Sequence, residues 1–254
     1  MKRTKNLGLA LVAVFAVSAM AATAASAAAP EFFHCVAKAG GTFAAGCETA
    51  GSGFAKEAVK TGSSIKFTDK EGVSHFNAKA SIGFTCTEDT SKGNITGPKS
   101  IASATVLFTG CTAKEGTKAG CKANSSGQMA GSGIIETNTL NGTLGGASAT
   151  KLGMQVPGES LVPTAPGTEF TKLEATCLGA QVQGVTGGVI GEVNPVGKMQ
   201  KTGELIFACT SAGSTVQKLA FLDAGPETVL KAFSAPACFE SKDEITFSEN
   251  IEVT

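Results

Sequence analysis

The sequence contains no tryptophan and no tyrosine, and its only arginine is Arg3. The usual aromatic platforms for stacking sugars and nucleobases are therefore missing, because phenylalanine is the only aromatic residue present. Beyond Arg3, no guanidinium group is available for bidentate binding of phosphate or carboxylate. The formal net charge is zero at pH 7. Together these absences argue against nucleic acid as a partner.

Long apolar runs are also missing, except for one at the N-terminus. Lys2, Arg3 and Lys5 precede an apolar segment at residues 7–20, and small residues follow it. This order predicts a signal peptide over residues 1–29, with cleavage after Ala27 or Ala28. No later segment reaches the roughly 18 apolar residues that span a bilayer. No lipidation box precedes Cys35. We therefore expect a secreted, extracellular protein with no transmembrane anchor after cleavage and at most a loose cell-wall association.

Removal of the signal peptide takes away three of the 21 basic residues, so the remaining charge is 18 − 21 = −3. All eight cysteines follow the signal, and an even number of cysteines in an oxidising compartment predicts disulfides. No two are close enough in sequence for a zinc site of the Cys-x2-Cys type. We therefore expect no metal and no cofactor. The cysteines are Cys35, Cys47, Cys86, Cys111, Cys121, Cys177, Cys209 and Cys238.

Eight cysteines allow 105 pairings. Short spacing favours Cys35 with Cys47 and Cys111 with Cys121, each closing a short loop that contains glycine. The remaining four must pair over longer distances. Alternation places Cys86, Cys177 and Cys209 on apolar strand faces, and we assign Cys86 to Cys177 and Cys209 to Cys238.

Alternating apolar and polar residues dominate the rest of the chain. The run at residues 244–253 places Ile245, Phe247, Ile251 and Val253 on one face, interrupted by Glu249, where we expect either a bulge or the rim of the sheet. Thirty-two glycines favour turns and strands over helices. The predicted fold class is all-β, an antiparallel β-sandwich or barrel. Further alternating runs cover residues 65–68, 80–87, 101–109, 131–137, 170–177, 203–210 and 217–222.

Two segments depart from this pattern. Residues 30–60 read as a loop-rich N-terminal cap around the first disulfide, with a short helix at Ala55–Thr61, followed by an all-β domain over residues 61–254. The prolines of Pro157–Thr168 predict an irregular connection. No fixed-period repeat is present.

Catalytic chemistry has few candidates. His34 and His75 are the only histidines, and we expect both to have surface roles. Motifs of zinc proteases, esterases and nucleotide-binding loops are absent. The Ser-x-x-Lys matches at residues 63–66 and 148–151 and the Lys-Thr-Gly matches at 60–62 and 201–203 are attributed to chance, because Ser63 leads into an alternating strand and a Ser-Asp-Asn motif is missing. We predict no enzyme and no catalytic residues.

Two pairs of adjacent carboxylates occur, Glu88 with Asp89 and Asp243 with Glu244. Neighbouring strand residues point to opposite faces, so neither pair aims two oxygens at one substrate, and we expect solvated hairpin ends. A weaker alternative gathers Glu88, Asp89 and Asn94 around calcium.

Several short motifs give the chain after the signal a specific pattern. They are Lys92-Gly93-Asn94-Ile95-Thr96-Gly97-Pro98-Lys99, Phe108-Thr109-Gly110-Cys111 followed by Cys121, residues 135–138 and 140–145, and Gly188-Val189-Ile190-Gly191 with residues 194–199. With these motifs the chain resembles a family of secreted, uncharacterised proteins that occur as many paralogues in high-G+C Gram-positive soil bacteria. In that family Cys86, Cys111, Cys121 and Cys177 look like the common set. The resemblance thus implies that Cys209 and Cys238 are additional and pair together, and it carries over no catalytic residue.

Three functions are consistent with these observations. The leading hypothesis is a non-enzymatic extracellular or cell-envelope protein, a binding or structural module with an unknown extracellular partner. The second is a β-barrel carrier, which requires a large closed apolar cavity for a small ligand. The third is a hydrolase, which requires a cleft with two converging acidic side chains.

Overall fold

The computed structural model describes residues 29–79, 82–117, 120–148, 155–165, 167–175, 181–208, 231–232 and 235–254. Within these ranges the chain forms nineteen strands and no helix, which confirms the all-β class. The described part accordingly contains no helix suited to crossing a membrane. Residues 1–28 of the predicted signal peptide and the run at residues 217–222 lie outside the described residues.

The strands have the following bounds: β1 Phe32–Ala37, β2 Phe54–Ala58, β3 Ile65–Glu71, β4 Ser74–Lys79, β5 Ile82–Cys86, β6 Glu88–Ile95, β7 Ser100–Thr109, β8 Thr112–Glu115, β9 Cys121–Ser125, β10 Ile135–Glu136, β11 Leu140–Ser148, β12 Gln155–Pro163, β13 Thr171–Ala175, β14 Gln181–Val185, β15 Val189–Asn194, β16 Gln200–Phe207, β17 Lys231–Ala232, β18 Ala235–Pro236 and β19 Cys238–Val253.

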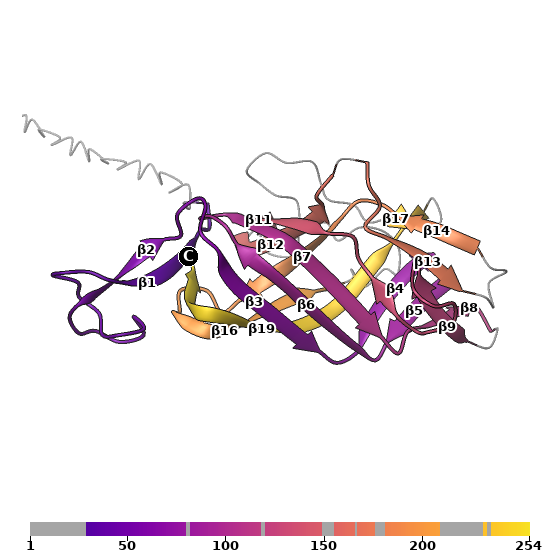
Figure 1. Ribbon diagram of the computed structural model, residues 1–254, viewed down its shortest axis with the longest axis horizontal. Helices are drawn as coiled ribbons and strands as arrows, with labels where there is room; N and C mark the ends of the chain where they lie inside the picture. The colour runs from indigo at the N-terminus through magenta and orange to yellow at the C-terminus, as the bar shows by residue number, and fades with distance from the viewer. Residues whose placement is uncertain are drawn as a thin grey trace, which may run out of the picture.

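Eight of these strands close into an antiparallel barrel (Figure 1). Around the barrel the order is β3, β6, β7, β11, β12, β15, β16 and β19, and β19 pairs again with β3. Alternation determines the two faces of the wall: in β3, Ile65, Phe67 and Asp69 are buried, whereas Lys66 and Lys70 are exposed. A barrel of eight strands is just wide enough for side chains to fill its interior.

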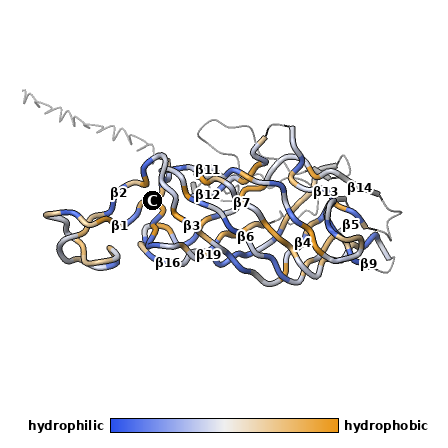
Figure 2. The backbone as a smooth tube through the Cα atoms, viewed as in Figure 1, coloured by the Kyte–Doolittle hydropathy of each residue, from blue (hydrophilic) through white to orange (hydrophobic). Residues whose placement is uncertain are grey.

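A second antiparallel sheet lies at one end of the barrel. The first residues of β19 pair with β4, and β4, β5, β8, β9, β13 and β14 follow in that order. The apolar side chains that line both parts form one continuous core, and Figure 2 shows hydrophobic stretches alternating with hydrophilic ones along these strands. The sheet therefore covers the apolar mouth of the barrel.

An N-terminal arm, residues 30–60, projects from the opposite end of the barrel (Figure 1). Strand β1 pairs with β2 and also with the end of β19, through Phe32 opposite Val253. The disulfide Cys35–Cys47 closes the loop between β1 and β2, which confirms the expected disulfide-closed cap. The predicted helix at Ala55–Thr61 is wrong, because Ala55–Ala58 pair with β1 as part of β2 and so short a segment would nucleate poorly as a helix.

Strand β19 runs through all three parts of the molecule. Its first residues pair with β4, its middle with β3 and β16, and its last residues with β1. Its register against β16 shifts between Thr246 and Ile251. This irregularity includes Glu249, so the interrupted apolar face marks a bulge, one of the two expected alternatives.

The structure corrects two of the predicted disulfides. Cys86 is bonded to Cys111, so the assignments of Cys86 to Cys177 and of Cys111 to Cys121 are wrong. The physical reason is the β6–β7 hairpin, which places Thr109 opposite Glu88 and so returns Cys111 to the side of Cys86. Cys121 and Cys238 are also disulfide-bonded. Cys177 and Cys209 lie outside the described residues, so the pairing of Cys209 with Cys238 stays a prediction.

The irregular connection expected at Pro157–Thr168 is largely a strand, since β12 includes Pro157 and Pro163. Strand β12 pairs with β11 along its whole length, but with β15 only from Gly158 to Leu161. The two prolines thus flank the segment that has partners on both sides, and their missing N–H groups do not interrupt the ladder between β12 and β15. Pro166 lies outside the described residues.

Gly41 allows the arm to fold back closely on itself. A Cβ at this position would lie 2.2 Å from the carbonyl oxygen of Phe54, a backbone atom that cannot turn away. Gly41→Ala should therefore cost about 1 to 3 kcal/mol locally and weaken the hydrogen bond from the Phe43 N–H to the Phe54 carbonyl. Hydrogen exchange of the Phe43 amide would measure this. Gly72→Ala is the control, because its Cβ meets no atom within 4 Å, and equal protection in the two variants would refute the prediction.

Candidate functional site

Three acidic side chains point into the barrel. Asp69 lies on β3, Asp243 on the adjacent β19, and Glu159 on β12, which is four strands from β3 in either direction around the barrel. Their relative exposures are 8%, 6% and 4%. All three line one cavity of about 30 Å³, which we call the acidic cavity. Carboxyl groups from opposite walls thus converge on one space.

The three carboxyl groups differ in their partners. Asp69 accepts hydrogen bonds from the backbone N–H and the hydroxyl of Ser91, and Asp243 accepts one from the hydroxyl of Ser241. Glu159 forms no side-chain hydrogen bond or ion pair with any described residue. A Cβ at Gly142 would lie 3.0 Å from Glu159 Oε1, so the glycine provides the space for this carboxyl group.

Burial, with a smaller contribution from the nearby charge of Asp69, raises the pKa of Glu159 to about 8. Among the described residues lining the acidic cavity there is no lysine or histidine to oppose these effects. At neutral pH the Glu159 carboxyl group therefore keeps its proton, which makes it a hydrogen-bond donor inside the barrel.

A second cavity, of about 40 Å³, lies between the barrel and the second sheet, and we call it the Phe cavity. Its walls include Phe76 and Phe84 from the second sheet, which pack with ring centroids 5.8 Å apart. Phe108, Phe170 and Phe239 line both cavities and so separate them. The rings of Phe108 and Phe239 meet edge to face, 5.7 Å between centroids.

These dimensions bear on two of the hypotheses. The converging carboxyl groups resemble the sign expected of a hydrolase, but a cavity of about 30 Å³ accommodates only about two water molecules and no sugar or peptide. The carrier hypothesis requires a large closed apolar cavity, and the Phe cavity is small by the same measure. Neither hypothesis gains support from the described residues.

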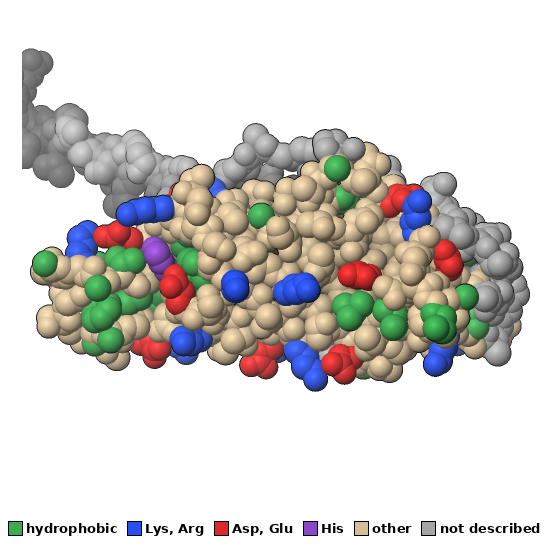
Figure 3. Space-filling model, in the orientation of Figure 1, with side chains coloured by type: hydrophobic (Ala, Val, Ile, Leu, Met, Phe, Trp, Pro, Cys, Tyr) green, Lys and Arg blue, Asp and Glu red, His purple; other side chains and the backbone are tan. Residues whose placement is uncertain are grey.

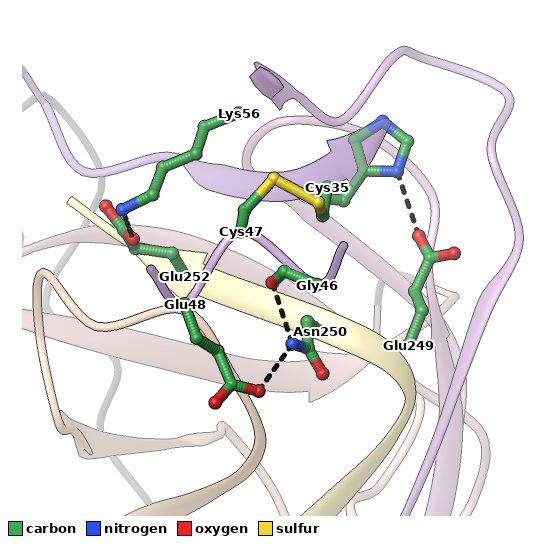
Figure 4. Close-up of a disulfide and its surroundings, with 9 residues drawn as sticks. Cys35, Gly46, Cys47, Glu48, Lys56, Glu249, Asn250 and Glu252 are labelled. Atoms are coloured by element: carbon green, nitrogen blue, oxygen red, sulfur yellow. Dashed lines mark hydrogen bonds and ion pairs between the residues drawn. A yellow bond between two sulfur atoms is a disulfide. The ribbon is translucent and has the colours of Figure 1, made fainter. Parts of the chain in front are cut away.

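The base of the arm is held to β19 by several polar contacts (Figure 4). His34 Nδ1 lies 2.8 Å from Glu249 Oε1, and Lys56 forms an ion pair with Glu252. The Asn250 amide donates to the Gly46 carbonyl oxygen at 2.8 Å and to Glu48 at 2.9 Å. These contacts surround the Cys35–Cys47 disulfide, so several side chains as well as strand pairing fix the base of the arm to the barrel.

Neither histidine lines the acidic cavity, but His75 is among the residues that line the Phe cavity. His34 is half-buried in its pair with Glu249, whereas His75 is exposed with Nδ1 3.2 Å from the Thr85 hydroxyl. Among the described residues no group of three His, Cys, Asp or Glu side chains is arranged to hold a metal ion. Ser63 precedes β3 and Lys66 lies within it, exposed. The second Ser-x-x-Lys match ends at Lys151, outside the described residues.

The expectation that both acidic pairs are solvated is wrong for one member of each. Asp89 is 1% exposed and accepts a hydrogen bond of 2.6 Å from Ser74, while Glu88 pairs with Lys70 at 3.2 Å. Asp243 points inward and Glu244 outward. Adjacent strand residues face opposite sides, so a pair on a barrel wall always places one carboxyl group inside.

The proposed calcium group of Glu88, Asp89 and Asn94 does not converge. Glu88 and Asp89 point to opposite faces of the wall, and Asn94 Oδ1 accepts a hydrogen bond of 3.3 Å from Ser64.

Sequence reasoning missed Glu159, because its segment was read as an irregular connection. Recognition of β12 would have placed Pro157, Glu159 and Leu161 on one face, with the carboxyl group inside. Pro157 and Pro163 argued against a strand, and so the alternation of this segment was not recognised in the sequence. No protein-family model, curated protein or solved structure matches this chain, so its resemblance to the secreted soil-bacterial family stays a prediction.

Proposed function

We propose that this protein is an exported, non-enzymatic binding module of the extracellular space or cell envelope, and that the N-terminal arm is its recognition element. The observation that carries this proposal is the position of the arm, which extends from the end of the barrel and is stapled by Cys35–Cys47. A rigid protruding segment loses little conformational entropy when it binds.

The chemistry of the arm supports the same proposal. Its loop exposes small apolar residues around the half-buried Phe43, and Figure 3 shows hydrophobic side chains gathered at this end of the molecule. The exposed alanines are Ala37, Ala39, Ala45 and Ala50. The carboxyl groups inside the barrel, by contrast, are enclosed and cannot contact a macromolecule. The external partner is thus an apolar surface of the cell envelope or of another extracellular protein.

The oxidised cysteines support the location. Cys35, Cys47, Cys86 and Cys111 form disulfides, and structural disulfides persist in oxidising compartments. They are compatible with an extracellular protein.

A sedimentation assay tests the proposal. The purified, oxidised protein is mixed with isolated cell envelope of the producing bacterium, and the fraction that sediments with the envelope is measured. Charges in the exposed loop, in the double variant Ala39→Asp/Ala45→Asp, should reduce this fraction about tenfold, because the new carboxylates must be desolvated on binding.

Met129→Asp is the matched control, because Met129 is 81% exposed in the loop between β9 and β10, away from the arm. It should sediment like the unmodified protein. If both variants changed the sedimenting fraction equally, or if neither variant changed it, the arm would be ruled out as the recognition element.

A further inference from the structure

A hollow of about 140 Å³ lies on the outside of the barrel wall, and we call it the outer hollow. By the same measure it is several times larger than the acidic cavity or the Phe cavity. It lies over β6, β7 and β10, and alternation along these strands places most of its lining residues on the outer face. These outer residues are Thr90, Lys92, Thr105, Leu107 and Glu136.

The course of the chain after β10 creates the outer hollow. Glu136 pairs with Leu107, but the Asn138 N–H then donates at 2.9 Å to the segment before β13. The chain returns to β7 only at the start of β11, opposite Ala104. Among the described residues, no paired strand therefore lies beside Thr105 on this side, and the side chains around it enclose an open space.

We propose that the outer hollow binds a free α-amino acid with an aliphatic side chain. The guest's carboxylate accepts hydrogen bonds from Lys92, its ammonium group donates to Glu136, and its side chain packs on Leu107. This site goes beyond the proposed envelope binding and does not involve the arm.

Lys92 supplies the cation for the carboxylate. Its side chain is exposed and forms no hydrogen bond or ion pair with any described residue, whereas Lys70 on the neighbouring β3 pairs with Glu88 at 3.2 Å. The residues opposite Lys92 are Thr105 on β7 and Thr68 on β3, and both are neutral. All three donors of the Lys92 ammonium group are thus available to a guest.

Glu136 supplies the anion, and its position is fixed by its neighbours. Its backbone N–H donates to the Ser125 hydroxyl at 2.9 Å, and its carbonyl oxygen accepts from the Thr171 hydroxyl at 2.7 Å. Its carboxylate accepts a hydrogen bond from the Gln128 amide through Oε2, at 3.0 Å. Oε1 has no hydrogen-bond partner among the described residues, so it can accept an N–H of the guest.

The spacing of the two charged residues suits an α-amino acid. Lys92 on β6 and Glu136 on β10 are separated by β7, so their strands lie about 9 to 10 Å apart. Hydrogen bonds of about 2.8 Å at each end leave roughly 4 Å between the ammonium and carboxylate groups of the guest. Lys92 also lies one outer row away from Glu136, and its flexible stem spans this offset. The charged ends of an extended dipeptide would lie about 3.5 Å further apart.

The floor of the outer hollow favours an aliphatic side chain. Leu107 is 36% exposed and lies directly opposite both Thr90 and Glu136, so its apolar surface stands beside the charged groups. The hydroxyls of Thr90 and Thr105 form no hydrogen bonds with described residues and can bind the polar groups of the guest. A volume of about 140 Å³ accommodates roughly ten water molecules, which is sufficient for an amino acid of the size of leucine.

An NMR titration of the oxidised protein with L-leucine at pH 7 tests the proposal. Saturable shift changes should centre on the amides of β6, β7 and β10. Lys92→Gln and Glu136→Gln should each weaken binding about fivefold, the upper range for one exposed ion pair. Lys66→Gln and Glu244→Gln are the matched controls and should leave the affinity unchanged, because both residues are exposed and neither lines the outer hollow. Circular dichroism melts check that all four variants fold.

Three further guests define which groups are recognised. 4-Methylpentanoate lacks the ammonium group, 3-methylbutylammonium lacks the carboxylate, and glycine lacks the aliphatic side chain, so each should bind severalfold more weakly than leucine. Glu136→Gln should not change the binding of 4-methylpentanoate, and Lys92→Gln should not change that of 3-methylbutylammonium.

Two results would overturn the proposal: no shift changes up to the solubility limit of leucine, or equal leucine binding by the unmodified protein, Lys92→Gln and Glu136→Gln. The sedimentation assay is independent of this titration, because no residue of the arm lines the outer hollow.

Discussion

Glu159→Gln should make the protein markedly more stable above pH 8 and should remove a large part of the pH dependence of its stability. In the unfolded chain Glu159 loses its proton near pH 4.5, whereas in the folded chain it keeps the proton to about pH 8. Between these values the folded state binds more protons, so the free energy of unfolding falls as pH rises and levels off above pH 8. The difference in pKa corresponds to roughly 5 kcal/mol. Glutamine has the same shape and cannot ionise.

Urea unfolding at pH 5, 7 and 9, followed by far-ultraviolet circular dichroism, measures this effect. The informative quantity is the difference between variant and unmodified protein at each pH, because other titrating groups contribute to both. The difference should grow with pH. Glu244→Gln, on the outer face of β19, should show no such growth. A constant difference across the three pH values would show that Glu159 ionises normally in the folded protein.

Removal of the Cys86–Cys111 disulfide should strongly destabilise the protein. This bridge spans 25 residues and lies in the core, where Cys86 is 6% and Cys111 0% exposed. Cross-linking over this span contributes about 3 to 4 kcal/mol in the chain-entropy model, and the loss of packed sulfur atoms adds to the cost. In Cys86→Ala/Cys111→Ala we therefore expect the midpoint of thermal unfolding to fall by about 10 °C or more.

The matched comparison is Cys35→Ala/Cys47→Ala, which removes a bridge over 12 residues in the arm. Because the arm packs at the end of the barrel, its bridge should affect hydrogen exchange of β2 strongly and the unfolding midpoint of the barrel only slightly. A larger drop in the midpoint for the arm variant than for the core variant would contradict this assignment of the two bridges.

Most of the fold prediction came from the alternation of apolar and polar residues along the chain. Period-two patterns located β3, β7 and β19, and they placed Ile245 and Phe247 together on the inner face of the wall. The bulge at Glu249 was predictable for the same reason, since a charged residue on an apolar face requires a local change of register. Once a strand is recognised, the alternation of its side chains determines which face each residue occupies.

Local patterns of this kind do not show which distant cysteines or strands pair with each other. Cys111 lies ten residues from Cys121 in sequence, but the β6–β7 hairpin brings it to Cys86, and loop-closure cost alone favours the wrong partner. Glu159 was missed for a related reason. Prolines usually oppose strands, and only the short pairing of β15 makes Pro157 and Pro163 compatible with β12.

The course of β19 has a consequence for the order in which the molecule assembles. This segment pairs with β3 to seal the cylinder, although the two are separated by most of the chain. Contacts of such high sequence separation form late, since the entropy of a very large loop must be overcome first. A polypeptide of this topology stays open until its C-terminal strand has been synthesised. The barrel closes only when β19 pairs with β3, one of the first strands of the chain.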